Sequence, residues 1–175
     1  MLSSKNLKNV LCLSIIMNAK GHLISGFIFS MTIIFLLDYL SIIKFVQSIE
    51  NIFLLILIIS SYSLLPDIDH RSSKMTGYLL VIGFVALSLP VIQLSTTIKL
   101  INDPLRLLIF STIILFFPIL GPRIFRHRGI IHSLPVGILA AFLVHWLFSN
   151  PLFTIIAFVS YYSHLLADGY LLKLK

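Results

Sequence analysis

Stretches of apolar residues alternate with short polar stretches along almost the whole sequence. Charged residues, proline and glycine bound the apolar stretches, because they are disfavoured inside a lipid-facing helix or end it. The pattern predicts six helical segments, the first reaching residue 45 if it bends and the third kinked at Pro90. These segments are 22–37, 52–65, 77–94, 104–120, 134–148 and 151–172. Several are shorter than the roughly 20 residues that span a bilayer, so five spans stay an alternative.

The composition is that of an integral membrane protein. Of 175 residues, 58% are hydrophobic and only 11% are charged, whereas a soluble domain carries about 25% charged residues. We therefore expect an all-α, polytopic membrane protein with about six transmembrane or membrane-embedded helices. No repeat or linker divides residues 17–175, which we interpret as a single membrane-embedded domain. Residues 1–16 hold a short apolar run with no small-residue cleavage site, which favours an N-terminal extension over a signal peptide.

The alternation of six spans predicts which segments share a side of the membrane. The N-terminus, the ends of the second and sixth helices and the segment before the fifth helix fall on one side. Lys44, Lys99 and Arg106 fall on the other side, which leaves ten of the 13 Lys and Arg residues on the first. The positive-inside rule therefore predicts an inner or plasma membrane protein with this side, and both termini, in the cytoplasm. The same bias explains the net charge of +7, so we expect no specific nucleic-acid binding.

His164 and Asp168 lie four positions apart in the last apolar segment. This spacing places the imidazole and the carboxylate on one face of a helix. An ionised carboxylate inside a membrane needs a compensating cation or hydrogen-bonding partners. The motif alone supports a metal-binding pair and a hydrogen-bonded buried pair about equally.

Asp67 and Asp69, followed by His70, come directly after Pro66 at the end of the second apolar segment. A polar helix end that leads into an interfacial loop is one explanation, because aspartate is common at such breaks. Two neighbouring aspartates also repel each other, and a divalent cation would relieve that repulsion. The motif is therefore a second candidate for metal binding.

Segment 126–133 is a polar island in an otherwise apolar region and contains His127, Arg128 and His132. One explanation is a basic interfacial loop whose arginines only determine the topology. The alternative is that the histidines act as ligands or acid–base groups and that arginine binds an anion such as phosphate. Within this island, His132 is the better ligand candidate, and Arg128 is the arginine favoured for phosphate binding.

His22, at the start of the first helix, becomes a candidate only because the other polar groups are predicted on the same side. His145 falls near the opposite end of its helix and is left out of the site. Imidazole and carboxylate ligands without thiolate suit zinc, manganese or iron. More than four ligands would accommodate one or two ions, which activate water for attack on a phosphoester while arginine neutralises the phosphoryl charge.

Four motifs also carry a family resemblance. They are His22, Leu65-Pro-Asp-Ile-Asp-His70, His127-Arg-Gly-Ile-Ile-His132-Ser133 and Ser163-His164-Leu-Leu-Ala-Asp168-Gly169. Over residues 17–172 the sequence resembles, in this order, the membrane-bound metal-dependent hydrolases known as LexA-binding, inner-membrane-associated hydrolases. That family is more distantly similar to zinc-dependent phospholipase C and P1-type nucleases. The extension 1–16 departs from the family pattern, which begins close to the first histidine.

The resemblance implies a hydrolase and assigns roles to individual residues. Its implied metal ligands are His22, Asp67 or Asp69, His132, His164 and Asp168. His127 is then a further ligand or a neighbour of the ligands. Asp69, His127 and Arg128 are the residues that we expect to take part in catalysis.

Three classes of function remain open on the sequence. The first is metal-dependent hydrolysis of a phosphoester in a lipid or lipid-linked substrate, reached from the cytoplasmic leaflet. The second is metal handling or cation transport, which is disfavoured because the helix interiors carry few polar groups to form a path. The third is a non-catalytic docking protein whose basic face binds a partner or anionic lipid, and this leaves the carboxylate of Asp168 unexplained.

Overall fold

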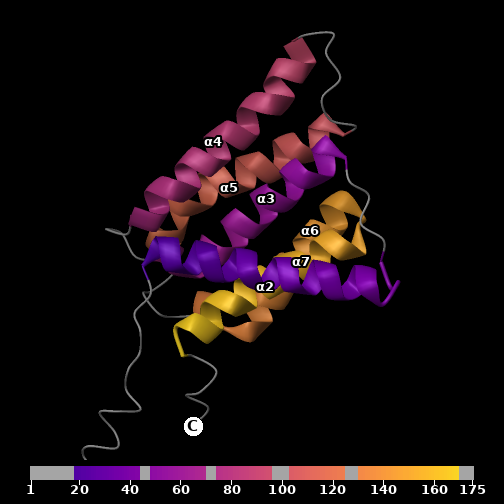
Figure 1. The fold of residues 1–175 in the computed structure, drawn as a ribbon. Helices are drawn as coiled ribbons and strands as arrows, with labels where there is room; N and C mark the ends of the chain where they lie inside the picture. The colour runs from indigo at the N-terminus through magenta and orange to yellow at the C-terminus, as the bar shows by residue number, and fades with distance from the viewer. Residues whose placement is uncertain (1–17, 44–47, 70–73, 96–102, 125–129, 170–175) are drawn as a thin grey trace, which may run out of the picture.

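A computed structural model describes residues 18–43, 48–69, 74–95, 103–124 and 130–169 (Figure 1). Within these parts all regular structure is helical and comprises six α-helices and two short 3₁₀ helices. This confirms the all-α prediction. The α-helices are α2 (Ala19–Tyr39), α3 (Ile49–Leu64), α4 (Lys74–Ser95), α5 (Pro104–Ile124), α6 (Leu134–Phe148) and α7 (Pro151–Ala167). The 3₁₀ helix η1 (Leu65–Asp69) continues α3, and η2 (Ile130–His132) precedes α6.

The last helix ends earlier than the predicted residue 172. α7 stops at Ala167, where the N–H of Asp168 still donates to the carbonyl of His164. Gly169 then adopts a left-handed backbone conformation with φ of 68°, which glycine enters without steric cost and which commonly ends a helix. Asp168 therefore lies at the end of α7 rather than inside it.

Three of the described helices are long and apolar enough to cross a membrane. These spans are Ala19–Tyr39, Ile49–Asp67 and Thr76–Gln93. The apolar stretches Pro104–Leu120, Leu134–Phe148 and Pro151–Ala167 are shorter. α2 illustrates the membrane character, because Phe35 is 73% exposed although the helix is strongly apolar. Exposed apolar side chains of this kind are expected where a helix faces lipid.

α3 and α7 form the centre of the bundle. α2 and α6 pack against α7, α2 also packs against α3, and α4 pairs along its length with α5 (Figure 1). The core is built from aliphatic and aromatic side chains of these helices, such as Ile58, Phe110, Ile156 and Tyr161. A tight turn at Ser149 and Asn150 joins α6 to α7, so the two helices run antiparallel.

Small and hydroxylated residues line the contact between α2, α3 and α7. Ser30 Oγ and Ser160 Oγ form a buried hydrogen bond of 2.9 Å between α2 and α7. Gly26, one turn before Ser30, faces Ser63 so closely that an added Cβ would lie 2.9 Å from the Cβ of Ser63. Small residues permit such close approach of membrane helices. This packing holds the first turn of α2 against the ends of α3 and α7.

Candidate metal centre

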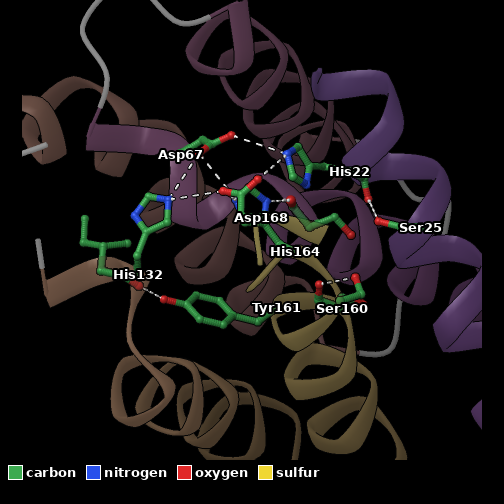
Figure 2. A network of polar contacts seen from close by, with 11 residues as sticks. His22, Ser25, Asp67, His132, Ser160, Tyr161, His164 and Asp168 are labelled. Atoms are coloured by element: carbon green, nitrogen blue, oxygen red, sulfur yellow. Dashed lines mark hydrogen bonds and ion pairs between the residues drawn. The ribbon is translucent and has the colours of Figure 1, made fainter. Parts of the chain in front are cut away.

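Helix ends from four parts of the chain meet at one point of the bundle. The first turn of α2 carries His22, η1 carries Asp67, and η2 carries His132. The last turn of α7 carries His164, and Asp168 follows directly at the end of this helix (Figure 2). The three histidines are almost completely buried, with exposed fractions of 1%, 7% and 0% in chain order. The sequence predicted all of these ends on one side of the membrane, and the structure brings all five side chains together (Figure 2).

Each carboxylate contacts more than one imidazole. Asp67 Oδ1 lies 3.3 Å from His132 Nε2 and 3.4 Å from His164 Nε2. Asp168 Oδ2 lies 3.4 Å from His164 Nε2 and 3.9 Å from His132 Nε2. Ligand atoms of these four residues all fall within 4.8 Å of one another. Two imidazoles and two carboxylates therefore surround one common point.

Three of these four distances match a metal centre better than a hydrogen-bonded cluster. Charge-assisted hydrogen bonds between nitrogen and carboxylate oxygen are about 2.7–2.9 Å long. A tetrahedron with metal–ligand bonds of about 2.0–2.2 Å has edges of about 3.3–3.6 Å. The contacts of His164 Nε2 with Asp67 and Asp168, both 3.4 Å, fall in that second range. The residues present thus fit a divalent cation.

The orientation of the His164 ring is fixed by its other nitrogen. Nδ1 lies 2.8 Å from the backbone carbonyl of Ser63, which can only accept, so Nδ1 is assigned as the protonated donor. Nε2 then carries a lone pair and points toward both carboxylates. Metal-binding histidines usually have such a partner on the second nitrogen, because it sets the tautomer and the ring orientation.

His132 is positioned through its neighbour in the chain. The hydroxyl of Tyr161, on α7, donates a buried hydrogen bond to the backbone carbonyl of Ile131 in η2. The ring of Tyr161 also packs on Gly137 of α6, where an added Cβ would lie 2.6 Å from Cδ1. Tyr161 therefore fixes both the start of α6 and the backbone next to His132.

Electrostatics also favour a bound cation. Within the described residues, the ion pairs of Asp67 and Asp168 are all formed with histidines. With no ion bound, burial and the neighbouring charge of Asp67 raise the pKa of the Asp168 carboxyl, but the hydrogen bond with a protonated His164 and the charges of His164 and His22 outweigh them and hold that pKa below its usual value. The carboxylate is thus ionised near neutral pH and is available as a ligand. A bound cation would take the place of the proton on His164 Nε2.

Other predicted residues fall elsewhere. The side chain of Asp69 and residues 125–129, which include His127 and Arg128, lie outside the described part, and their roles stay predictions. His145 lies at the opposite end of α6 from His132, and its Nδ1 is 3.2 Å from Thr154 Oγ1, as expected for a residue left out of the site.

Sequence reasoning missed the groups that hold the ligands in place. The carbonyl of Ser63 gives no signal in a sequence, because every residue has one. Tyr161 and Gly26 could have been found by their spacing, since Gly26 follows His22 by one helical turn and Tyr161 precedes His164 by three residues. Residues at these distances share a helix face.

Comparisons with known proteins add the family. No curated protein and no solved structure matches the chain. Residues 17–171 match the family of the YdjM inner membrane protein. The match includes α2 to α7 and every residue that forms the candidate centre. The family assignment agrees with the apolar helices, and it supports the predicted membrane location. The chain therefore belongs to the YdjM inner membrane protein family.

Proposed function

We propose that this protein is a metal-dependent membrane hydrolase that cleaves phosphoester bonds in a lipid or lipid-linked substrate. The observation that carries the proposal is the convergence of two buried histidines and two partly exposed aspartates, from η1, η2 and the end of α7, on one point. Ordinary helix capping needs neither two carboxylates nor three buried imidazoles at one place. Zinc is the ion that suits this ligand set best, and manganese or iron would also accept it.

The residues suit hydrolysis as well as binding. When bound, a divalent cation would supply Lewis acidity, which generates a water nucleophile near neutral pH and stabilises negative charge on a phosphoryl oxygen. His164 is held by the carbonyl of Ser63, and the backbone beside His132 is held by Tyr161. Both ligands are thus fixed before substrate binds, which is the condition for electrostatic catalysis.

A lipid substrate is favoured by the surroundings of the site. Ile24, Leu134 and Leu166 each stand two positions from a site histidine and are 60%, 39% and 36% exposed. In a membrane these side chains face lipid, so acyl chains would stay in the bilayer while a head group reaches the ligands. The charge bias of the sequence assigns this side to the cytoplasm, so we propose a substrate of the cytoplasmic leaflet.

The first test is metal content. The full chain would be purified in detergent without chelators, and bound metal would be measured by elemental analysis. We expect stoichiometric metal in the wild type and its loss in His132→Ala and Asp168→Asn. His145→Ala and Asp103→Asn are matched controls, because His145 lies at the far end of α6 and Asp103 pairs with Arg106 at 2.8 Å. Wild-type protein without metal would exclude a metal-dependent enzyme.

The second test is activity. The metal-loaded protein would be offered a lipid phosphomonoester, a glycerophospholipid diester, a lipid-linked pyrophosphate and a soluble aryl phosphate. We expect hydrolysis of at least one lipid substrate, and loss of that hydrolysis in Asp168→Asn but not in Asp103→Asn. Stoichiometric metal with no hydrolysis of any phosphoester would refute the hydrolase and favour the alternative of cation handling.

A further inference from the structure

The rings of His22 and His164 are stacked face to face inside the candidate centre. Their centroids are 3.8 Å apart and their planes are inclined by only 18°. Both residues are buried, with 1% and 0% exposed. In each ring Nε2 is the nitrogen that contacts a carboxylate. The two imidazoles therefore present their Nε2 atoms to the same pair of aspartates from parallel positions.

Stacked rings cannot serve one ion. The lone pair of an imidazole nitrogen lies in the ring plane, so a bound ion lies close to that plane. Two ring planes that are inclined by 18°, with ring centroids 3.8 Å apart, meet on the order of 10 Å away, whereas a metal lies about 2 Å from its nitrogen. An ion in the plane of His164 is thus far out of the plane of His22. His22 needs an ion of its own if it is a ligand.

The carboxylates offer a separate set of oxygens to His22. Asp168 contacts His164 and His132 through Oδ2, but it contacts His22 Nε2 through Oδ1, at 3.4 Å. Asp67 contacts the same two histidines through Oδ1, and its Oδ2 lies 4.0 Å from His22 Nε2. Each aspartate thus turns one oxygen toward the His132–His164 side and the other toward His22.

We propose a second divalent-cation site formed by His22 Nε2, Asp168 Oδ1 and Asp67 Oδ2. The two aspartates bridge it to the site formed with His132 and His164. Bridged ion pairs in phosphoesterases are about 3.5–4 Å apart, which matches the 3.8 Å spacing of the stacked rings that would carry the two ions. This inference rests on the proposed hydrolase site and deepens it.

The second site differs from the first in its ligand number. It has three protein ligands among the described residues, whereas the first has four. Catalytic zinc sites characteristically have three protein ligands and leave a position open for water or substrate. Among the residues that the structure describes, the His22 site is therefore the one with room for a reacting group, and a substrate phosphoryl oxygen would bind on this side.

Metal stoichiometry tests the proposal directly. Zinc would be loaded onto the purified full chain, excess would be removed by dialysis, and bound zinc would be counted by elemental analysis. We expect two ions per chain in the wild type and in His145→Ala, and one ion in His22→Ala. One ion in both the wild type and His22→Ala would overturn the second site and leave the hydrolase proposal intact. No ion in the wild type would overturn both.

A measurement on the wild type alone guards against a His22→Ala variant that does not fold. With manganese in place of zinc, electron paramagnetic resonance distinguishes an isolated ion from a pair coupled through bridging carboxylates. We expect the coupled spectrum at full loading. A spectrum of isolated ions at full loading would overturn the bridged pair, whatever the behaviour of the variant. Thermal melts of His22→Ala and His145→Ala would show that both variants are folded when their metal is counted.

Discussion

Replacing Gly26 by alanine would force α2 away from α3. The new Cβ would overlap with Oγ of Ser63 and lie 2.9 Å from its Cβ. Rotation of the Ser63 side chain can move Oγ, but the other contact joins two carbon atoms whose positions the backbones determine. Carbon atoms pack at about 3.5–4.0 Å, so the 2.9 Å contact requires the helices to separate by at least about 0.6 Å.

The displacement would reach the candidate centre. His22 precedes Gly26 by one helical turn on the same face, so it moves with that part of α2. Metal–ligand distances tolerate only about 0.2 Å, less than the required separation. We expect Gly26→Ala to weaken binding of the His22-side ion by about tenfold or more. Overpacking of this kind lowers the free energy of unfolding by about 1–3 kcal/mol.

A metal titration and a thermal melt in detergent measure these two effects. Gly77→Ala is a matched control, because an added Cβ on Gly77 meets nothing within 4 Å. It should leave metal affinity unchanged and stabilise α4 by up to about 1 kcal/mol, since alanine favours a helix more than glycine does. The melt and the titration together separate a general loss of stability from a local shift of His22.

Rescue tests the steric cause. Ser63→Gly removes the Cβ that the new methyl group at position 26 would strike, and it keeps the backbone carbonyl that binds His164 Nδ1. The double variant Gly26→Ala/Ser63→Gly should therefore recover much of the metal affinity that Gly26→Ala loses. In a double-mutant cycle this recovery appears as a coupling free energy between the two contacting residues. Additive losses in the cycle, or a Gly26→Ala variant that behaves like Gly77→Ala, would refute the reasoning.

Three further outcomes follow. Tyr161→Phe should lower metal affinity by about tenfold. The control Tyr62→Phe removes a 2.6 Å hydrogen bond to the carbonyl of Ala140 and should lower only the free energy of unfolding, by about 1 kcal/mol in a thermal melt. Equal metal affinities of the two variants would contradict positioning by Tyr161. Ser30→Ala should cost about 0.6 kcal/mol in a melt without changing metal content. Metal uptake should release protons and weaken on acidification, because an imidazole must lose its proton to bind a metal. Metal titrations at several pH values test this, and an affinity that does not change with pH would contradict histidine ligands.

The sequence was sufficient to predict the helices and the meeting of their ends. If each of the six apolar segments crosses the membrane, they alternate in direction, which predicts the start of the first and the end of the last on the same side. The four-residue spacing of His164 and Asp168 places both on one face, and the structure places both in the centre. Helix ends were less predictable, because Asp168 lies at the end of α7 only through the left-handed conformation of Gly169.

The partition of the ligands could not be predicted. Sequence reasoning placed His22 and His164 in one set of ligands, because nothing in the sequence shows whether the two rings point at the same ion or stack. Their stacking at 3.8 Å depends on the close approach of α2 to α3 and α7. A carboxylate likewise carries two oxygens, and the histidine that each one faces is decided only when four helix ends pack together.

The location of the centre follows from the physics of the bilayer. Inside hydrocarbon the backbone must satisfy its own hydrogen bonds, so helix interiors stay regular and mostly apolar. The ends of helices escape this restriction, and the site residues lie in a first turn, in two 3₁₀ segments and at a helix end. Polar chemistry is thus concentrated where irregular backbone is tolerated, while Ser30 and Ser160 hold α2 against α7 from within the bundle. A membrane chain with few charged residues can in this way bring two carboxylates and three imidazoles to one point without a polar path through its centre.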